Sequence, residues 1–413
     1  MYQVLYRKWR PQAFADVYGQ NHITAALKNE LQTGRLAHAY LFTGSRGTGK
    51  TTCAKIMAKA VNCLHPVDGD PCNECDICKG IDSGAIMDVV EIDAASNNGV
   101  DNIRDLREEV NFTPAVAKYR VYIIDEVHML STGAFNALLK TLEEPPPHVV
   151  FILATTEVHK LPATILSRCQ RFDFHRIQPA DIAARIQYVA GQEQFTVTDE
   201  AATLLARLAD GALRDALSLL DQCVSRSREI TADVVAETTG LAGREYLFEL
   251  SAAVRAGDSG AALALIDRLY NASKDMERLC AEWTEYFRNL MILKSVKDAA
   301  DLIVAPPAEL HRMAAEAEQF ELPAILHCMN VLQQALERLR GGVSRRVEME
   351  MAVLRLCSPD LDASADSLLR RVKMLEDTIK SGMTLAPQAP AAPSRPAARA
   401  EGGEPESPPL PSN

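Results

Sequence analysis

Residues Gly44 to Thr51 have the spacing and the context of a phosphate-binding loop. The loop fits G-x-x-x-x-G-K-[ST] and lies between an apolar run and a helical run. Glycines let the backbone curl so that several N–H groups face a phosphate, and the next helix adds its positive end. We expect Lys50 to reach the β- and γ-phosphates of ATP and Thr51 to offer its hydroxyl to Mg²⁺. The expected nucleotide-binding set is Gly44, Ser45, Arg46, Gly47, Thr48, Gly49, Lys50, Thr51 and Thr52.

Two carboxylates follow the apolar run Val121–Ile124, which predicts a buried strand. Asp125 ends this strand and is expected to hold Mg²⁺ together with Thr51. Glu126 is the natural base to polarise an attacking water, so the pair favours hydrolysis over nucleotide storage. The letters Asp-Glu-Val-His at 125–128 also resemble a helicase box, so a helicase-like motor stays an alternative.

Four of the ten cysteines crowd into sixteen positions, at Cys63, Cys72, Cys75 and Cys78. Four thiolates this close, in a polar and turn-rich segment, suit one tetrahedral Zn²⁺ ion in a closed structural site. An iron–sulfur cluster is the chemical alternative. The sequence therefore predicts a zinc module at about 63–80, inserted between the phosphate-loop helix and the acidic strand.

Three more polar residues are candidates for contact with a nucleotide. Thr156 follows the apolar run Phe151–Ala154 and could position the lytic water. Arg168 lies twelve residues beyond Thr156, and Arg214 lies in a helical segment. Each arginine could contact a phosphate, although single arginines are more often solvated or in surface ion pairs.

Strands and helices that alternate through the first 175 residues must position these side chains. Strands are expected at Ala39–Thr43, Asp88–Ile92, Val121–Ile124 and Val149–Ala154, and helices at Thr51–Asn62 and Gly133–Glu143. This alternation favours an α/β unit with a parallel sheet and helices on both faces. Beyond about Pro179 the strand signals fade and helical periodicity takes over. We expect a nucleotide domain at 1–178, a helical domain at 179–241, a second at 242–360, one more helix at 361–385 and a Pro/Ala-rich tail at 386–413.

Composition excludes other classes of protein. The 413 residues are 47% hydrophobic and 24% charged, with no long apolar stretch and no secretory leader, so we expect a cytoplasmic protein. The net charge of −11 argues against coating nucleic acid by bulk charge. That total combines +7 over residues 1–60, which hold the phosphate loop, with −7 over residues 61–120.

Taken together, these motifs resemble the gamma/tau subunit family of bacterial DNA polymerase III, the ATPase motor of the sliding-clamp loader. The resemblance covers about 1–357 and is most specific over 1–240. It implies an AAA+ fold, with an α/β P-loop domain carrying the zinc insert, then a helical lid and an all-α collar that oligomerises. It rests on Arg7–Pro11, Gly19-Gln20, the phosphate loop, the four cysteines, Asp125–His128, Leu138–Pro145 and Ser167–Cys169.

The resemblance also implies roles for single residues. Arg168 would reach the ATP site of a neighbouring subunit in trans, and Arg214 would read the γ-phosphate of the chain's own ATP. Thr156 matches the first sensor position, and the four cysteines match the family's zinc module. The adenine pocket would be lined by residues near Arg7, Pro11 and Val17.

The expected cofactors are ATP, Mg²⁺ and Zn²⁺. The implied partners are the delta and delta-prime subunits, further copies of this chain, the sliding clamp, and primer–template DNA contacted through its phosphates. The polymerase core and the helicase would bind only a longer tau form, whereas this chain ends in the linker and looks like a gamma-length form. The chain would be a P-loop ATPase within a DNA-directed DNA polymerase complex, hence classed with the nucleotidyltransferases. A nucleotide-binding scaffold with a zinc nucleic-acid module is the other alternative.

Overall fold

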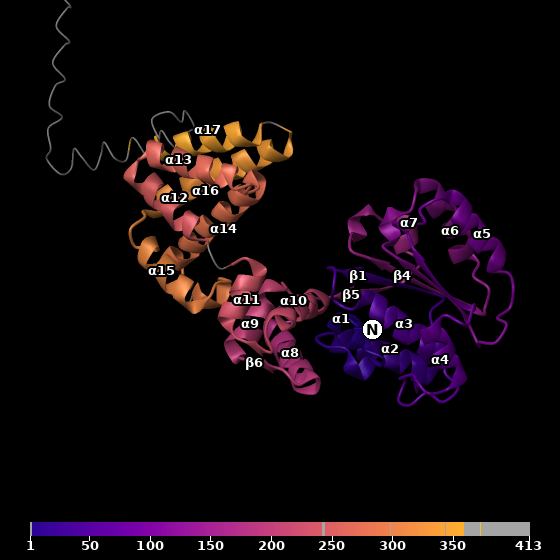
Figure 1. Ribbon diagram of the computed structural model, residues 1–413. Coiled ribbons are helices and arrows are strands. Elements are labelled where there is room, and N and C mark those ends of the chain that lie inside the picture. The colour runs from indigo at the N-terminus through magenta and orange to yellow at the C-terminus, as the bar shows by residue number, and fades with distance from the viewer. Residues whose placement is uncertain (1, 242–243, 298, 343, 359–371, 373–413) are drawn as a thin grey trace, which may run out of the picture.

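The computed structural model describes residues 2–241, 244–297, 299–342, 344–358 and 372. A sheet with helices on its faces comes first, a small group of helices follows, and a larger all-helical group ends the described chain (Figure 1). None of the described helices is long and apolar enough to cross a membrane. The helix predicted at 361–385 and the tail at 386–413 lie outside the described residues, apart from residue 372.

The sheet has five parallel strands in the order β2-β3-β4-β1-β5. Parallel pairing brings the carboxyl ends of all five strands to one edge, which is where α/β proteins bind their ligands. The edge strand β5 was missed by the sequence prediction because most of its side chains are polar or exposed. The strands are β1 (Ala39–Gly44), β2 (Val89–Asp93), β3 (Arg120–Asp125), β4 (Val149–Thr155) and β5 (Gln170–Phe174).

Helices cover both faces of this sheet, as the alternation predicted. Tyr40 and Phe42 of β1 face α2 and α3, whereas Leu41 between them faces α5, α6 and α7. Neighbouring side chains of a strand point to opposite faces, so one run of apolar residues fills two cores. The helical elements of this unit are α1 (Leu5–Lys8), η1 (Phe14–Asp16), α2 (Asn21–Thr33), α3 (Lys50–Asn62), α4 (Asp76–Ser83), α5 (Val100–Glu109), η2 (Val127–Met129), α6 (Thr132–Glu143), η3 (Val158–Lys160) and α7 (Ala163–Leu166).

The next unit packs four helices around leucine and alanine side chains. Its two short strands pair in parallel, a detail that the helical periodicity did not predict. The N-terminal helix α1 docks on this unit, since Leu5 joins its core and the Trp9 Nε1 donates to Glu193 at 2.8 Å. The elements are α8 (Pro179–Glu193), β6 (Thr196–Val197), α9 (Asp199–Leu208), α10 (Leu213–Arg226), β7 (Glu229–Ile230) and α11 (Ala232–Thr239).

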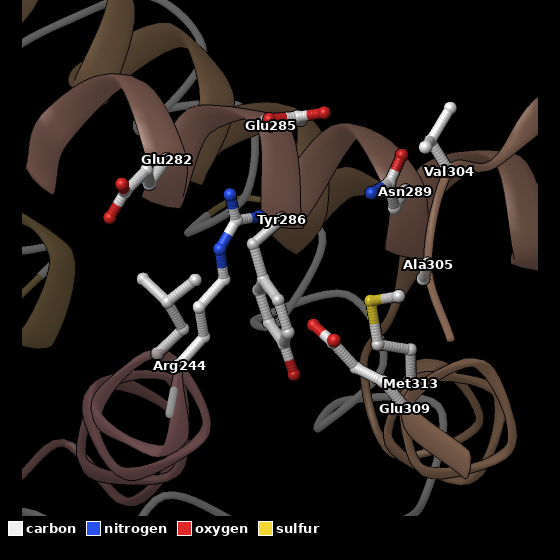
Figure 2. A pocket seen from close by; sticks show the side chains of 10 residues that line it. Arg244, Glu282, Glu285, Tyr286, Asn289, Val304, Ala305, Glu309 and Met313 are labelled. Carbon is white, nitrogen blue, oxygen red and sulfur yellow. The ribbon is translucent and has the colours of Figure 1, made fainter. Parts of the chain in front are cut away.

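The last described unit is all helical and has a core of its own around Trp283, whose Nε1 donates to the Ser251 hydroxyl at 3.0 Å. Figure 2 shows a small polar cavity here, with Tyr286 between Arg244 and Glu309. Burial raises the pKa of Glu309. The elements are α12 (Glu245–Ala256), α13 (Ser259–Asn271), α14 (Met276–Ser295), η4 (Ala299–Leu302), α15 (Pro307–Ala317), α16 (Leu322–Arg340) and α17 (Arg345–Cys357).

Candidate functional site: a phosphate loop, an acidic strand end and a cysteine cluster

The loop between β1 and α3 has the backbone that a phosphate cradle needs. Gly44, Gly47 and Gly49 have φ angles of 139°, 77° and 107°, which residues with a Cβ atom rarely adopt. Inside the loop, the Thr48 hydroxyl donates to the carbonyl of Ser45 at 2.8 Å. Helix α3 begins at Lys50, so its free N–H groups lie where the loop ends. Arg46 is exposed at the loop surface.

Lys50 lies inside this cradle, with only 5% of its surface exposed. Its Nζ donates to the carbonyl oxygens of Gly44 and Ser45, each at 2.8 Å. Burial lowers the pKa of Lys50, while the carboxylates of Glu126 and Asp125 act in the opposite direction. A buried ammonium that is held only by neutral carbonyls is ready to exchange them for anionic phosphate oxygens.

The Thr51 hydroxyl and the Asp125 carboxylate meet at the carboxyl edge of the sheet. Thr51 Oγ1 donates to Asp125 Oδ2 at 2.7 Å, although the two residues are 74 positions apart. A hydroxyl and a carboxylate beside a phosphate cradle are the oxygen ligands that Mg²⁺ takes in nucleotide sites. The donor set therefore fits Mg²⁺, with Thr51 and Asp125 as the residues that would hold it.

Glu126 is tied to the end of the neighbouring strand β4. Its Oε2 accepts from the Thr156 hydroxyl at 2.8 Å and from the Thr156 backbone N–H at 3.1 Å. The His128 Nδ1 lies 3.3 Å from the same oxygen. Glu126 has φ 46°, in the left-handed region. The structure thus brings Thr156 to the acidic pair and holds the carboxylate through two donors of one residue.

Arg168 lies away from the phosphate loop of its own chain. Its Nη2 pairs with Glu143 at 2.7 Å, and its Nη1 donates to the carbonyl of Thr164 at 2.9 Å. These partners belong to α6 and α7, which cover the sheet face opposite α3. The described contacts of Arg168 include none with the residues Gly44–Thr51.

Arg214 stands at the start of α10, two residues after Ala212, which lies against the phosphate loop. A Cβ added to Gly47 would come within 2.7 Å of the Ala212 Cβ, so the loop touches the segment that leads into α10. The Arg214 guanidinium lies 5.0 Å from the centroid of the Tyr6 ring. A hydrogen bond from Arg7, and then one from Arg214, lower the pKa of Tyr6. Arg214 is thus near the loop but rests on an aromatic face.

The three N-terminal residues predicted to line an adenine pocket lie in different environments. Arg7 is exposed and its Nε donates to the Tyr6 hydroxyl at 3.2 Å, while Pro11 is half-buried. Val17 is buried in the core of α2, α3 and the sheet. A direct link to the first turn of the loop helix is Arg10, whose Nε donates to the Thr52 hydroxyl at 3.1 Å. Sequence reasoning missed Arg10, although it stands among the basic residues of Arg7–Pro11.

The four cysteines predicted to bind metal converge. Their Sγ atoms all lie within 4.8 Å of one another. Backbone N–H groups of Cys72, Cys75 and Cys78 donate to the sulfurs of Cys63, Cys72 and Cys75, at 3.2, 3.3 and 3.4 Å. The N–H groups of Glu74 and Cys75 lower the pKa of Cys72 to about 6, which favours the thiolate that metals bind. The cluster fits one tetrahedral ion such as Zn²⁺.

We predict that the purified chain carries one zinc ion, because the four thiols are close enough to supply all four ligands of a tetrahedral ion, with no position left for water. Metal analysis should give about one zinc per chain, since a closed site of four thiolates binds a single ion. Cys75→Ser should lose most of it, whereas Cys169→Ser, at a cysteine outside the cluster, should keep it. Iron in place of zinc, or equal metal content in both variants, contradicts the assignment.

The chain is similar to several known proteins. Family models described as the DNA polymerase III delta subunit, the clamp loader subunit ATPase lid domain, and subunits gamma and tau domain III match residues 19–178, 181–229 and 230–371. The DNA polymerase III subunit tau of Bacillus subtilis is 44% identical over 99% of this chain and 72% of its own length. The tau/gamma subunit of Haemophilus influenzae is 39% identical, and this chain spans 51% of it. The RuvB Holliday junction branch migration motor of Thermotoga maritima is 19% identical, with a TM-score of 0.43, over 60% of this chain and 79% of its own.

The parallel sheet, the phosphate loop and the lid after it define a protein of the AAA+ class. Within that class, the chain belongs to the family of DNA polymerase III gamma/tau subunits, as the identity to the Bacillus subtilis relative shows.

Proposed function

We propose that this chain is an ATP-hydrolysing motor subunit of the clamp loader, which opens the sliding clamp and loads it onto primer–template DNA. The observation that carries the proposal is the cluster at the sheet edge. There Lys50 lies in the cradle, Thr51 touches Asp125, and Glu126 is held by Thr156. Membership of the gamma/tau family supports the assignment to the clamp loader, and this cluster supports ATP hydrolysis.

Each residue of the cluster has a distinct task in the proposed reaction. The loop N–H groups and Lys50 bind and orient the phosphates, and Thr51 and Asp125 would hold Mg²⁺, which would supply positive charge beside the phosphate oxygens. Glu126 accepts a proton from the attacking water. Both hydrogen bonds from Thr156 go to Oε2, so the carboxylate keeps acceptor sites for that water. Arg214 would leave the face of Tyr6 to read the γ-phosphate.

Assembly completes the site in this proposal. The described contacts of Arg168 include no residue of its own loop, so it would be offered to the ATP of the next subunit. The partners would be delta, delta-prime, further copies of this chain, the clamp, and DNA through its phosphates. The proposed division is a nucleotide domain at 1–178, a lid at 179–241 and a collar at 242–360. Binding of the polymerase core and the helicase, and the nucleotidyl transfer reaction, would be properties of the larger DNA polymerase III assembly and not of the cluster described above.

The deciding experiment is phosphate release by the assembled clamp loader, measured with and without clamp and primed DNA. Stimulation of turnover by both together supports the motor. Nucleotide binding without stimulated turnover would instead favour a scaffold. Strand separation by this chain alone would favour a helicase-like motor.

Glu126→Gln is expected to keep ATP binding and to lower turnover by about 10²–10⁴-fold, because the amide cannot take a proton. Steady-state phosphate release and equilibrium nucleotide binding measure the two effects separately. Glu157→Gln is the matched control, since Glu157 lies at the same edge but pairs with Lys160 at 2.6 Å. Equal loss of turnover in both variants would argue that charge, not base catalysis, matters there.

A further inference from the structure

One lysine of the phosphate-loop helix is buried on the side of α3 that faces the cysteine cluster. Lys59 lies on α3 nine residues after Lys50 and is 1% exposed. Lysine is almost never buried this completely unless its charge is paired. Its Nζ donates to Gln12 Oε1 at 2.7 Å, Asn73 Oδ1 at 2.7 Å and Asp82 Oδ2 at 3.1 Å. The three donor positions of an ammonium are therefore all used.

The three acceptors come from separate parts of the chain. Asn73 lies between Cys72 and Cys75, and has φ 59°, so the turn between two cluster cysteines determines where its side chain points. Asp82 lies on α4, the helix that carries Cys78. Gln12 belongs to the N-terminal segment. Lys59 thus joins the cysteine cluster to that segment through the helix that begins at the phosphate loop.

A second contact joins the same parts. Asp70, two residues before Cys72, accepts from the Phe14 backbone N–H at 2.6 Å and pairs with Lys28 at 2.6 Å. Phe14 is buried in the core that α2 and α3 form with the sheet. At the other end of this segment, Arg10 donates to Thr52, the residue next to the predicted Mg²⁺ ligand Thr51. The segment 10–14 is therefore held by the cysteine module at one end and by the phosphate-loop helix at the other.

We propose that metal in the cysteine cluster and nucleotide at the phosphate loop bind cooperatively, with Lys59 as the positioning residue that links them. A bound metal fixes the turn that holds Asn73 and the helix that holds Asp82. Lys59 then holds Gln12, and the ordered segment keeps Arg10 on the first turn of α3. Without the metal, this order has to be created when the nucleotide binds. The inference rests on the proposed nucleotide binding at Gly44–Thr51.

The test is a cycle of four full-length proteins: wild type and Lys59→Met, each zinc-loaded or stripped and kept reduced. The measurement is the equilibrium affinity for a fluorescent ATP analogue with Mg²⁺. Couplings between sites typically change affinity by about 5–150-fold. We expect stripping to weaken wild-type binding by about 10-fold, Lys59→Met to weaken it similarly, and stripping of Lys59→Met to add less than about twofold.

If the two sites are coupled, nucleotide must also change the zinc affinity. This second measurement would stay unchanged if Lys59 only stabilised the fold. Saturating nucleotide should raise the zinc affinity of the wild type, titrated against a chelator, by the same factor of about 10. In Lys59→Met this increase should disappear. Lys55→Met is the matched control on the same helix, because Lys55 is half-exposed and pairs with Glu91 at the surface, at 2.5 Å. It should behave as the wild type in both measurements.

If Lys59→Met fails to fold, Gln12→Ala replaces it, since Gln12 is exposed and its loss leaves Lys59 paired with Asn73 and Asp82. Gln12→Ala should keep its zinc and still lose most of the coupling. Stripped wild type that binds nucleotide as tightly as the loaded form overturns the inference. The inference is also overturned if zinc removal weakens nucleotide binding by the same factor in Lys59→Met as in the wild type, because the two changes would then act independently. A loaded wild type that binds no nucleotide at all overturns the proposed function as well, which distinguishes the two failures.

Discussion

Arg168→Ala is expected to leave ATP binding nearly unchanged and to lower turnover of the assembled complex by about 10³–10⁵-fold, the usual effect of losing an arginine finger. The reason is that Arg168 touches none of its own phosphate-loop residues and pairs with Glu143 instead. That pair is partly exposed, so giving it up to reach a neighbouring subunit costs only about 0–1 kcal/mol. Phosphate release with clamp and primed DNA, beside nucleotide affinity, measures the two effects.

The control is Arg171→Ala, which removes another arginine three residues away. Arg171 pairs with Asp173 on the edge strand β5, at 2.7 Å, and is about as exposed as its partner. It should retain normal turnover. A mixed assembly is more informative still, because wild-type subunits placed next to the variant should lose turnover at their own intact loops. If binding and turnover fall together in Arg168→Ala, the trans role is wrong.

Lys50→Ala is expected to abolish ATP binding at any practical concentration. The ammonium would make two charge-assisted hydrogen bonds to phosphate oxygens, worth about 1.5–3 kcal/mol each, so affinity should fall by at least about 100-fold. The fold should survive, because Lys50 bonds only to loop carbonyls that can turn to water. Titration with a fluorescent ATP analogue measures the loss, and circular dichroism checks the fold.

Lys55→Ala on the same helix is the control and should bind ATP normally, since its partner is the surface residue Glu91. Turnover measured for Lys50→Ala should be lost in parallel with binding, in contrast to Glu126→Gln, which should lose turnover alone. Normal affinity in Lys50→Ala would mean that nucleotide binds somewhere other than this loop.

The parts of the candidate site whose residues are near one another in the chain were predictable from the sequence. The loop Gly44–Thr51 and the cysteines at 72, 75 and 78 are each close together in the chain, so residue types and order were enough to expect the loop backbone and the cysteine cluster that the structure has. Asp125 was found because a buried strand had to end there. The same logic placed four of the five strands, and β5 escaped it because its Phe174 alone is fully buried.

The rest depends on which distant segments meet, and that is decided by the packing of the whole domain. The bonds from Thr156 to Glu126, from Arg10 to Thr52 and from Lys59 to Gln12 join residues 30, 42 and 47 positions apart. In the sequence, Lys59 is one of several lysines on a helix and carries no mark of burial. Its environment exists only once the cysteine module folds over α3.

The backbone at Glu126 has a consequence for how this protein can change. A non-glycine residue in the left-handed region carries a conformational cost of about 1–2 kcal/mol, and Glu126, at φ 46° and ψ 45°, carries it at the position proposed to be the base. Glycine there would relieve the cost and remove the carboxylate together. Glycine would also lose the two hydrogen bonds that this carboxylate accepts from Thr156 and would give the unfolded chain more freedom, so the strained backbone and the proposed base are retained together at this single position.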